Sequence, residues 1–371
     1  MKFNFIIISV GIIKDVFRLF TGMYLFSIDI ATTGYFFATI SPAIIFLTWS
    51  ENVDGESLID DNPETNLKTY YFPISGLIIC ISYLIFSPIF FQYVFIYFIT
   101  RIGYFYYRTF LIENDLHLKL MYQKLIEVLL LLILIMFRSK LSIEYLLILF
   151  LSIQNIPSLF FLNRLKQYMF ALDYSNFKFE KSVFLSARSL SILLKNIVNN
   201  VDSILLASFG NPEGAGLVKY IRSMGNGQNL VINQIVDRFR HSFLKKWIQQ
   251  NNKKHLLSTI IIFLCFGLSF GFIFFKYVVN LIENIFYVPE FPVYTILFFG
   301  LYAVSPVMRV SYLYSKQMKF NIITHLIIFI NFICFVVFHV DSLFNYIILP
   351  QLIALLTFLI WVYKLNYNKV L

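Results

Sequence analysis

Residues 217–237, LVKYIRSMGNGQNLVINQIVD, carry two cations and three asparagines in a stretch that otherwise has the composition of a membrane-spanning helix. The polar residues are spaced three or four apart and would form one stripe on a helix. They are Lys219, Arg222, Asn226, Asn229, Asn233 and Asp237. A charged side chain that faces lipid costs about 2.5–3.5 kcal/mol on insertion scales. The stripe is therefore expected to face a watery interior, which favours a transporter of an anionic molecule.

The composition is that of an integral membrane protein. Hydrophobic residues make up 59% of the chain, the mean hydropathy is +0.74, and only 13% of residues are charged, against about 25% in soluble domains. The net charge of +10 fits basic cytoplasmic loops beside anionic lipid better than a nucleic-acid partner. Cys80, Cys265 and Cys334 lie in apolar runs without ligand spacing, so neither a disulfide nor a metal site is expected.

About twelve segments are long and apolar enough to span a membrane, so we expect an all-α protein. The first run lacks a small-residue cleavage site and is expected to be retained as a helix. The expected spans are 3–24, 30–49, 69–87, 88–108, 120–137, 142–163, 184–208, 214–236, 256–284, 291–315, 320–340 and 343–364.

The distribution of basic residues places both termini in the cytoplasm. On that assignment Arg138 and Lys140 are the two basic loop residues outside. The cytoplasmic side has eighteen: Lys2, Lys68, Lys119, Lys124, Arg164, Lys166, Lys178, Lys181, Arg238, Arg240, Lys245, Lys246, Lys253, Lys254, Lys316, Lys319, Lys364 and Lys369. The acidic loop 51–64 also falls inside, but acidic residues contribute little to topology. The external connections are too short for a folded extracellular domain.

The sequence predicts that the chain consists of two copies of a six-span unit. Gly34 and Gly216 are 182 residues apart, with a serine seven or eight residues before each. Six spans in each half would give both halves the same orientation, as in parallel repeats about an axis along the membrane normal. We therefore expect an N-terminal lobe with a cytoplasmic linker at 1–183 and a C-terminal lobe at 184–371.

Three more predicted spans carry polar stripes at helical spacing. The seventh contains Arg188, Ser191, Lys195, Asn199 and Asp202; the fourth contains Tyr93, Tyr97, Arg101, Tyr104 and Arg108; the tenth contains Tyr302, Ser305, Arg309, Tyr312 and Lys316. In the first span Lys14 and Arg18 are four apart, with Asp15 beside Lys14.

Residues near helix ends, such as Arg108, Lys316 and Asp237, are expected to reach the interface. The central cations are harder to explain in that way. They are Arg18, Arg101, Arg188, Lys195, Lys219, Arg222 and Arg309. The expected buried carboxylates are fewer: Asp15, Asp29, Glu127 and Asp202. Some of these would pair with cations as charge compensation. The remaining positive charge calls for water or an anionic ligand such as a diphosphate, whose oxygens guanidinium groups bind bidentately.

Glu127 is the lone carboxylate in the core of its span. It could carry a coupling proton or sodium ion, or it could pair with Lys124 one turn away. Tyrosines beside the arginines would suit a sugar, although they are more often packing residues. No enzyme signature is present: the five histidines are scattered, and no phosphate-binding loop occurs. We therefore expect neither a catalytic residue nor a cofactor.

Two stretches resemble polysaccharide flippases of the multidrug/oligosaccharidyl-lipid/polysaccharide exporter superfamily. NNVDSILLASFGNPEGAGLVKYIRSMGN (199–226) is similar to the start of that family's second half, through Asp202, Gly210, Gly216 and Tyr220. VSPVMRVSYLYSKQMKFNII (304–323) is similar to its connection between the tenth and eleventh helices. The chain is short for the family, and its first two spans match poorly.

The resemblance implies two six-helix lobes around a central cationic cavity in the bacterial inner membrane. The substrate would be an undecaprenyl-diphosphate-linked oligosaccharide of O-antigen or capsule, moved outward by alternating access. Arg18, Arg101, Arg188, Lys195, Lys219, Arg222 and Arg309 would bind it, with Glu127 and Asp202 as candidates for ion coupling. A proton or sodium gradient would drive transport, and the polymerase and chain-length proteins of the same pathway would be partners.

Two other functions stay open at this point. A multispan polysaccharide polymerase or glycosyltransferase of the same pathway would usually have a sizeable external loop or a clustered acidic motif, and neither occurs. A drug or ion antiporter of the same superfamily would favour an acidic cavity for cationic drugs, which the charge balance opposes.

Overall fold

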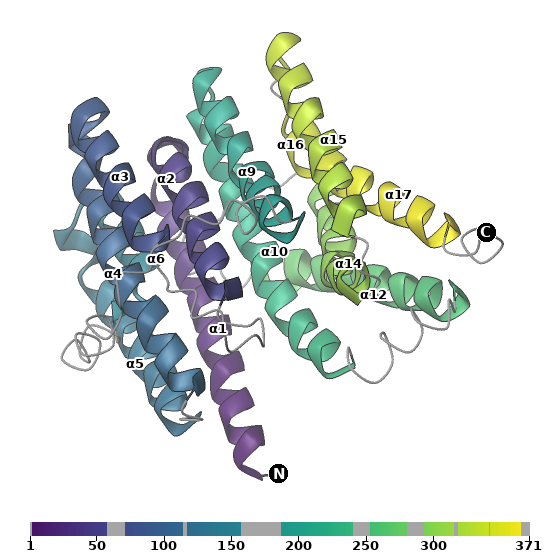
Figure 1. Ribbon diagram of the computed structural model, residues 1–371, viewed down its shortest axis with the longest axis horizontal. Helices are drawn as coiled ribbons and strands as arrows, with labels where there is room; N and C mark the ends of the chain where they lie inside the picture. The colour runs from purple at the N-terminus through teal and green to yellow at the C-terminus, as the bar shows by residue number, and fades with distance from the viewer. Residues whose placement is uncertain are drawn as a thin grey trace.

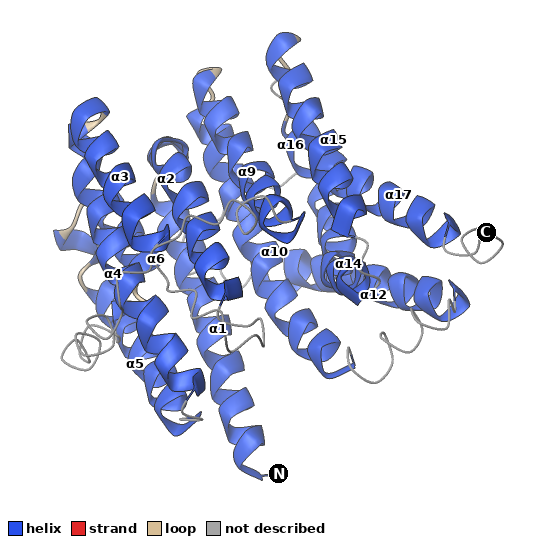
Figure 2. Ribbon diagram, viewed as in Figure 1, coloured by secondary structure: helices blue, strands red, loops and turns tan. Residues whose placement is uncertain are grey.

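The computed structural model describes residues 2–57, 71–113, 117–156, 187–239, 253–279, 293–314, 318–340 and 342–364. Within these ranges the chain is helical and has no strand (Figure 2). The helices run close to one another in a bundle on the N-terminal side, and α12, α14 and α17 are tilted away from it (Figure 1). The all-α prediction is confirmed for the described residues.

The described part of the first half contains six α-helices and a short 3₁₀ turn. They are α1 (Lys2–Ile28), α2 (Ile30–Ser57), α3 (Tyr71–Phe86), α4 (Pro88–Glu113), α5 (His117–Met136), η1 (Arg138–Lys140) and α6 (Ile143–Ser152).

The described part of the second half continues in the same way. It contains α9 (Ala187–Ser208), α10 (Pro212–Phe239), α12 (Lys253–Ile273), the π-helical segment η5 (Phe274–Val279), α14 (Tyr294–Tyr314), α15 (Met318–Val337), α16 (Leu343–Ile347) and α17 (Leu349–Lys364).

Local hydrogen bonds and backbone geometry explain where two of the central helices, α2 and α10, begin. Asp29 caps α2, because its side chain accepts hydrogen bonds from the Thr32 backbone N–H at 2.9 Å and from the Thr32 hydroxyl at 2.7 Å. Asn211 caps α10 by accepting from the Gly214 backbone N–H at 2.7 Å. Gly210 before it has a φ of 76°, which glycine adopts without strain. Pro212 then occupies the first helical position, where no N–H is needed.

The structure corrects two predicted boundaries and shows a break within a third segment. The acidic segment 51–64 is not all loop, because α2 continues to Ser57; residues 58–64 lie outside the described part. In the predicted span 142–163 the described helix ends at Ser152. The predicted span 343–364 has the limits of the apolar segment Leu343–Lys364, and its helix is interrupted at Ile348, two residues before Pro350. Proline lacks an N–H and clashes with the preceding turn, so it disturbs a helix there.

Five described helical segments are long and apolar enough to cross a membrane: Ile30–Glu51, Ser189–Ser208, Lys253–Tyr277, Lys319–Val337 and Leu343–Lys364. Four shorter apolar helices accompany them: Pro73–Phe86, Pro88–Ile102, Ile143–Ser152 and Tyr294–Arg309. Many large apolar side chains point outward; Phe86, for example, is 83% exposed. Such a surface is suited to lipid. These features are those of a multi-pass membrane protein.

The helix packing of the first half recurs in the second. α1 packs against α5 as α9 packs against α15, and α3 packs against α4 as α12 packs against α14. α4 contacts α6, and α14 contacts α17. Across the middle, α2 packs against both α9 and α10, while α1 packs against α10.

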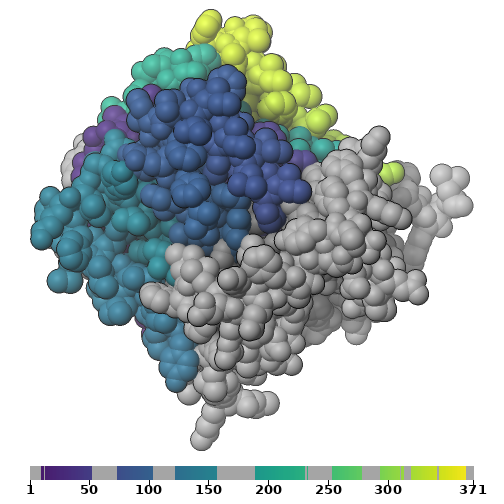
Figure 3. Space-filling view, turned by 60° about the vertical axis from the view of Figure 1, so that its left-hand side comes forward, coloured from purple at the N-terminus to yellow at the C-terminus, as the bar shows by residue number. Residues whose placement is uncertain are grey.

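The largest buried cluster surrounds these central helices. It joins Met23 of α1, Phe36 of α2, Phe98 of α4 and Tyr220 of α10. A second cluster, around Val304 and Trp361, holds α12, α14 and α17 together. Figure 3 brings the left-hand side of Figure 1 forward, and the blue residues of α3 and α4 lie on the surface there.

Candidate functional site

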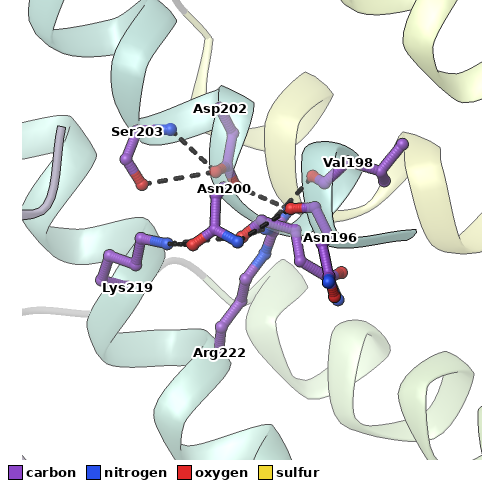
Figure 4. A network of polar contacts seen from close by, with 8 residues as sticks. Asn196, Val198, Asn200, Asp202, Ser203, Lys219 and Arg222 are labelled. Carbon is purple, nitrogen blue, oxygen red and sulfur yellow. Dashed lines mark hydrogen bonds and ion pairs between the residues drawn. The ribbon is translucent and has the colours of Figure 1, made fainter. Parts of the chain in front are cut away.

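The N-terminal part of the opening stripe, Lys219 and Arg222, faces α9. Arg222 Nη2 lies 2.6 Å from Asp202 Oδ2, and Arg222 Nη1 donates to the Asn199 carbonyl oxygen at 2.6 Å. Lys219 Nζ donates to the Asn200 side-chain oxygen at 2.8 Å and to the Asn199 carbonyl at 3.3 Å. Figure 4 shows both cations reaching from α10 toward this turn of α9. We call Asn199, Asn200, Asp202, Lys219 and Arg222 the α9–α10 network.

The α9–α10 network is buried and carries one net positive charge, since two cations share one carboxylate. Asp202 is 0% exposed and Arg222 is 7% exposed. Lys219 also lies over the ring of Phe37 of α2, with 5.6 Å from Nζ to the ring centroid. Backbone and amide oxygens supply the remaining acceptors. The predicted ion-coupling residue Asp202 is thus held in an ion pair.

A second network joins α1 to α5. Arg18 Nη1 donates to Glu127 Oε1 at 2.7 Å, and Lys14 Nζ lies 3.7 Å from Glu127 Oε2. Lys14 also pairs with Asp15 at 2.7 Å. Arg18 lies over the Phe150 ring at 5.2 Å. The carboxylate of Glu127 therefore pairs with cations of another helix.

Arg101 pairs with a residue that the sequence alone assigns to a loop. Its Nε donates to Glu51 Oε2 at 2.5 Å, and its Nη1 donates to the Tyr97 hydroxyl at 3.1 Å. Glu51 lies in the extended end of α2, so it belongs with the carboxylates that neutralise the central cations. Asp29, expected among those carboxylates, instead caps α2.

The third group of cations lies among α9, α14 and α15. Lys195 of α9 and Arg309 of α14 are close enough for their like charges to repel. The imidazole of His325 of α15 is also close enough to Lys195 to interact with it electrostatically. A 2.5 Å hydrogen bond from the Asn321 amide to the Ser191 hydroxyl holds α15 against α9 one turn away. Among the described residues no carboxylate pairs with Lys195 or Arg309. We call Lys195 and Arg309 the unpaired cationic group.

His325 of α15 is a neighbour of Lys195 that sequence reasoning missed. Its Nδ1 lies 2.7 Å from the Asn321 carbonyl oxygen. A carbonyl only accepts, so Nδ1 carries the proton and Nε2 is left as an acceptor in the neutral ring. The four-residue spacing of Asn321 and His325 was visible in the sequence, but nothing there indicated their approach to Lys195.

The middle of the opening stripe, at Asn226, meets α14. The Tyr302 hydroxyl donates to Asn226 Oδ1 at 2.7 Å, and the Tyr302 ring stacks on Phe298 with centroids 4.9 Å apart. Asn226 is exposed, whereas Asn229 is 8% exposed and its Oδ1 has no partner in the described part. Arg222 lies close enough to influence the Tyr302 hydroxyl electrostatically. The α10–α14 face therefore combines an aromatic ring, amides and a guanidinium.

The predicted binding residues thus separate into groups. Lys219 and Arg222 lie together, Lys195 lies near Arg309, and Arg18 and Arg101 each have their own carboxylate. Arg188 is in the first turn of α9, but its side chain lies outside the described part, as do those of Asn233 and Asp237. No set of three or more metal-binding side chains gathers within the described ranges.

Comparison with family models, curated proteins and solved structures finds no match to this chain. Its function must therefore be argued from the residues themselves.

Proposed function

We propose that this chain is a flippase that carries undecaprenyl-diphosphate-linked oligosaccharide repeat units, of O-antigen or capsule, outward across the bacterial inner membrane. The observation that carries the proposal is the unpaired cationic group. Lys195 is partly buried near the exposed Arg309, and no described carboxylate pairs with either cation. Such an arrangement is costly unless water or an anion compensates it.

A diphosphate is suited to that compensation. Its oxygens accept bidentate hydrogen bonds from a guanidinium, and an ammonium adds a point charge beside it. Arg309 is exposed and so can reach a ligand, while Lys195 is partly buried. Arg188 of α9, with Lys219 and Arg222 of α10, would extend the positive surface. Arg18 and Arg101 would contribute when their carboxylates release them.

The α10–α14 face supports a saccharide as the second part of the ligand. Sugar rings stack on aromatic side chains through their apolar faces, and their hydroxyls hydrogen-bond to amides and tyrosine. Tyr302, Asn226 and Asn229 supply those groups one to two turns inward from Arg222.

The matching helix packing of the two halves supports the proposed architecture. We place about twelve spans in two six-helix lobes, 1–183 and 184–371, around a central cationic cavity, with both termini in the cytoplasm. The 182-residue offset of the caps Asp29 and Asn211 is the same as that of Gly34 and Gly216. Duplicated lobes of the same orientation are the arrangement on which alternating access acts in many transporters.

An ion gradient is the proposed energy source. Glu127 and Asp202 are buried carboxylates in ion pairs, and protonation or sodium binding at either would release its arginine. Such a release would couple ion movement to substrate affinity. The polymerase and chain-length proteins of the pathway, together with membrane lipids, would be its partners.

The test is complementation of a deletion strain. We expect Lys195→Gln/Arg309→Gln to leave lipid-linked repeat units on the cytoplasmic face, because the diphosphate loses its partners. Lys253→Gln is the matched control, since Lys253 is a basic residue at a helix start and bonds to the Tyr363 carbonyl. Normal export by the double variant would contradict the proposal. Export of single, unpolymerised units by the deletion strain itself would indicate a polymerase instead.

A further inference from the structure

α2 and α10 touch backbone to backbone at two glycines. A Cβ added to Gly34 would overlap the Pro212 carbonyl oxygen and would lie 2.6 Å from the Gly216 nitrogen. A Cβ added to Gly216 would overlap the Ile30 carbonyl oxygen and would lie 2.7 Å from Ile30 Cγ2. Any side chain at either position would force these helices apart.

The contact is reciprocal. Ile30 and Pro212 are 182 residues apart, as are Gly34 and Gly216. Gly34 therefore meets Pro212, and Gly216 meets the residue that corresponds to Pro212 in the first half. Self-complementary pairing of this kind is what a two-fold axis produces. The axis relating the two halves thus passes between α2 and α10 at this crossing.

The crossing also covers the polar interior. Lys219 lies one turn inward from Gly216, and Arg222 lies one further turn inward. The hydrogen bonds described at residues 29–34 and 211–216 are local caps, from Thr32 to Asp29 and from Gly214 to Asn211. The buried Thr33 hydroxyl has no hydrogen-bond partner in the described part of the chain. Separating the helices here would break no described hydrogen bond.

We propose that the Gly34–Gly216 crossing is the outer gate of the transport path, closed in this structure. Opening separates α2 from α10 about the two-fold axis and exposes the α9–α10 network to the outside. This inference rests on the proposed transport function. It adds a defined closing element that neither the charge pattern nor the helix count specifies.

The first experiment measures access to a reporter cysteine at Ser223→Cys, two turns inward from Gly216. Cys80, Cys265 and Cys334 are replaced by serine or alanine, and intact cells with permeabilised outer membranes receive a membrane-impermeant maleimide. We expect weak labelling in the reporter chain and several-fold stronger labelling when Gly34→Ala or Gly216→Ala is added. Gly267→Ala is the matched control, because Gly267 meets the Phe299 backbone at the α12–α14 contact within one half. Unchanged labelling in both gate variants, or equal enhancement by the control, would overturn the gate.

A second measurement needs no change at the glycines and decides the question if those variants do not reach the membrane. Ala31→Cys and Glu213→Cys place spin labels at exposed, corresponding positions beside the crossing. Electron–electron distances are measured in nanodiscs made with lipid extracted from the producing cells. If the crossing is a gate, the Ala31→Cys/Glu213→Cys pair should give two populations of spin-label distance, one short and one long. The control pair Glu213→Cys/Phe338→Cys, which lies within the second half, should give a single distance population. A single short population for the first pair would refute the gate. Neither the labelling nor the distance measurement uses the substrate. Their failure would therefore contradict the gate alone, whereas normal repeat-unit export by the Lys195→Gln/Arg309→Gln variant would contradict the proposed function.

Discussion

Asp202 is a carboxylate without solvent contact whose charge is held by Arg222 at 2.6 Å. Buried ion pairs contribute little net stability, because desolvation offsets their attraction. Removing one partner is different, since the other charge is left buried and uncompensated. The α9–α10 network already has one excess cation, so it tolerates loss of its carboxylate poorly.

We predict that Asp202→Asn destabilises the protein by about 3–5 kcal/mol, the usual cost of breaking a buried ion pair. The melting temperature of detergent-purified protein measures it. Adding Lys219→Met restores the original net charge of the network and should recover part of the loss. Glu213→Gln, an exposed carboxylate on the same helix, should change little. A melting temperature of Asp202→Asn equal to that of Glu213→Gln would contradict the structural role.

At the scale of the element, the beginning of α2 depends on one side chain. Asp29 stands between α1 and α2 and accepts two hydrogen bonds from Thr32. The hydrogen bond from the Thr32 hydroxyl, followed by that from the Thr32 backbone, lowers the pKa of Asp29 below its ordinary value of 3.8. Because the folded pKa is lowered, the stabilisation is complete above about pH 3.8 and is lost as the pH falls through the lowered pKa.

We predict that Asp29→Ala costs about 0.5–2 kcal/mol, whereas Asp29→Asn costs less because asparagine caps as well as aspartate. Thermal unfolding of the purified variants measures this order. Any stability advantage of aspartate over asparagine should shrink as the pH is taken below 3.8, since only aspartate titrates. If the stability advantage of Asp29 over the Asp29→Asn variant instead grew as the pH fell below 3.8, the pKa of Asp29 would not be lowered in the folded protein.

At the scale of the whole molecule, the two halves have matching packing but unlike charge. The α1–α5 network has Glu127 for its arginine, whereas the unpaired cationic group lies in the second half without a described carboxylate. The proposed ligand would therefore be held mainly by the second half, while each half has one ion-paired arginine that could be released.

We predict that transport depends on an ion gradient and not on ATP, because the sequence contains no phosphate-binding loop. Dissipating the proton or sodium gradient in cells with maintained ATP should leave lipid-linked repeat units inside. Glu127→Gln should abolish the dependence on the coupling ion if that residue carries it. Export that persists without either gradient and stops on ATP depletion would contradict the prediction.

The sequence by itself determined that the described residues are helical and largely apolar, because both follow from local composition and periodicity. It also indicated the stripe of Lys219 and Arg222, since helical spacing alone brings those residues to one face. It did not indicate the caps Asp29 and Asn211, which the structure shows. It could not determine which charges neutralise which. Arg18 and Glu127 are 109 positions apart, and Arg101 and Glu51 are 50 apart. Only tertiary packing brings such residues within hydrogen-bond distance, and in an apolar protein that distance decides whether a cation is compensated or left for a ligand.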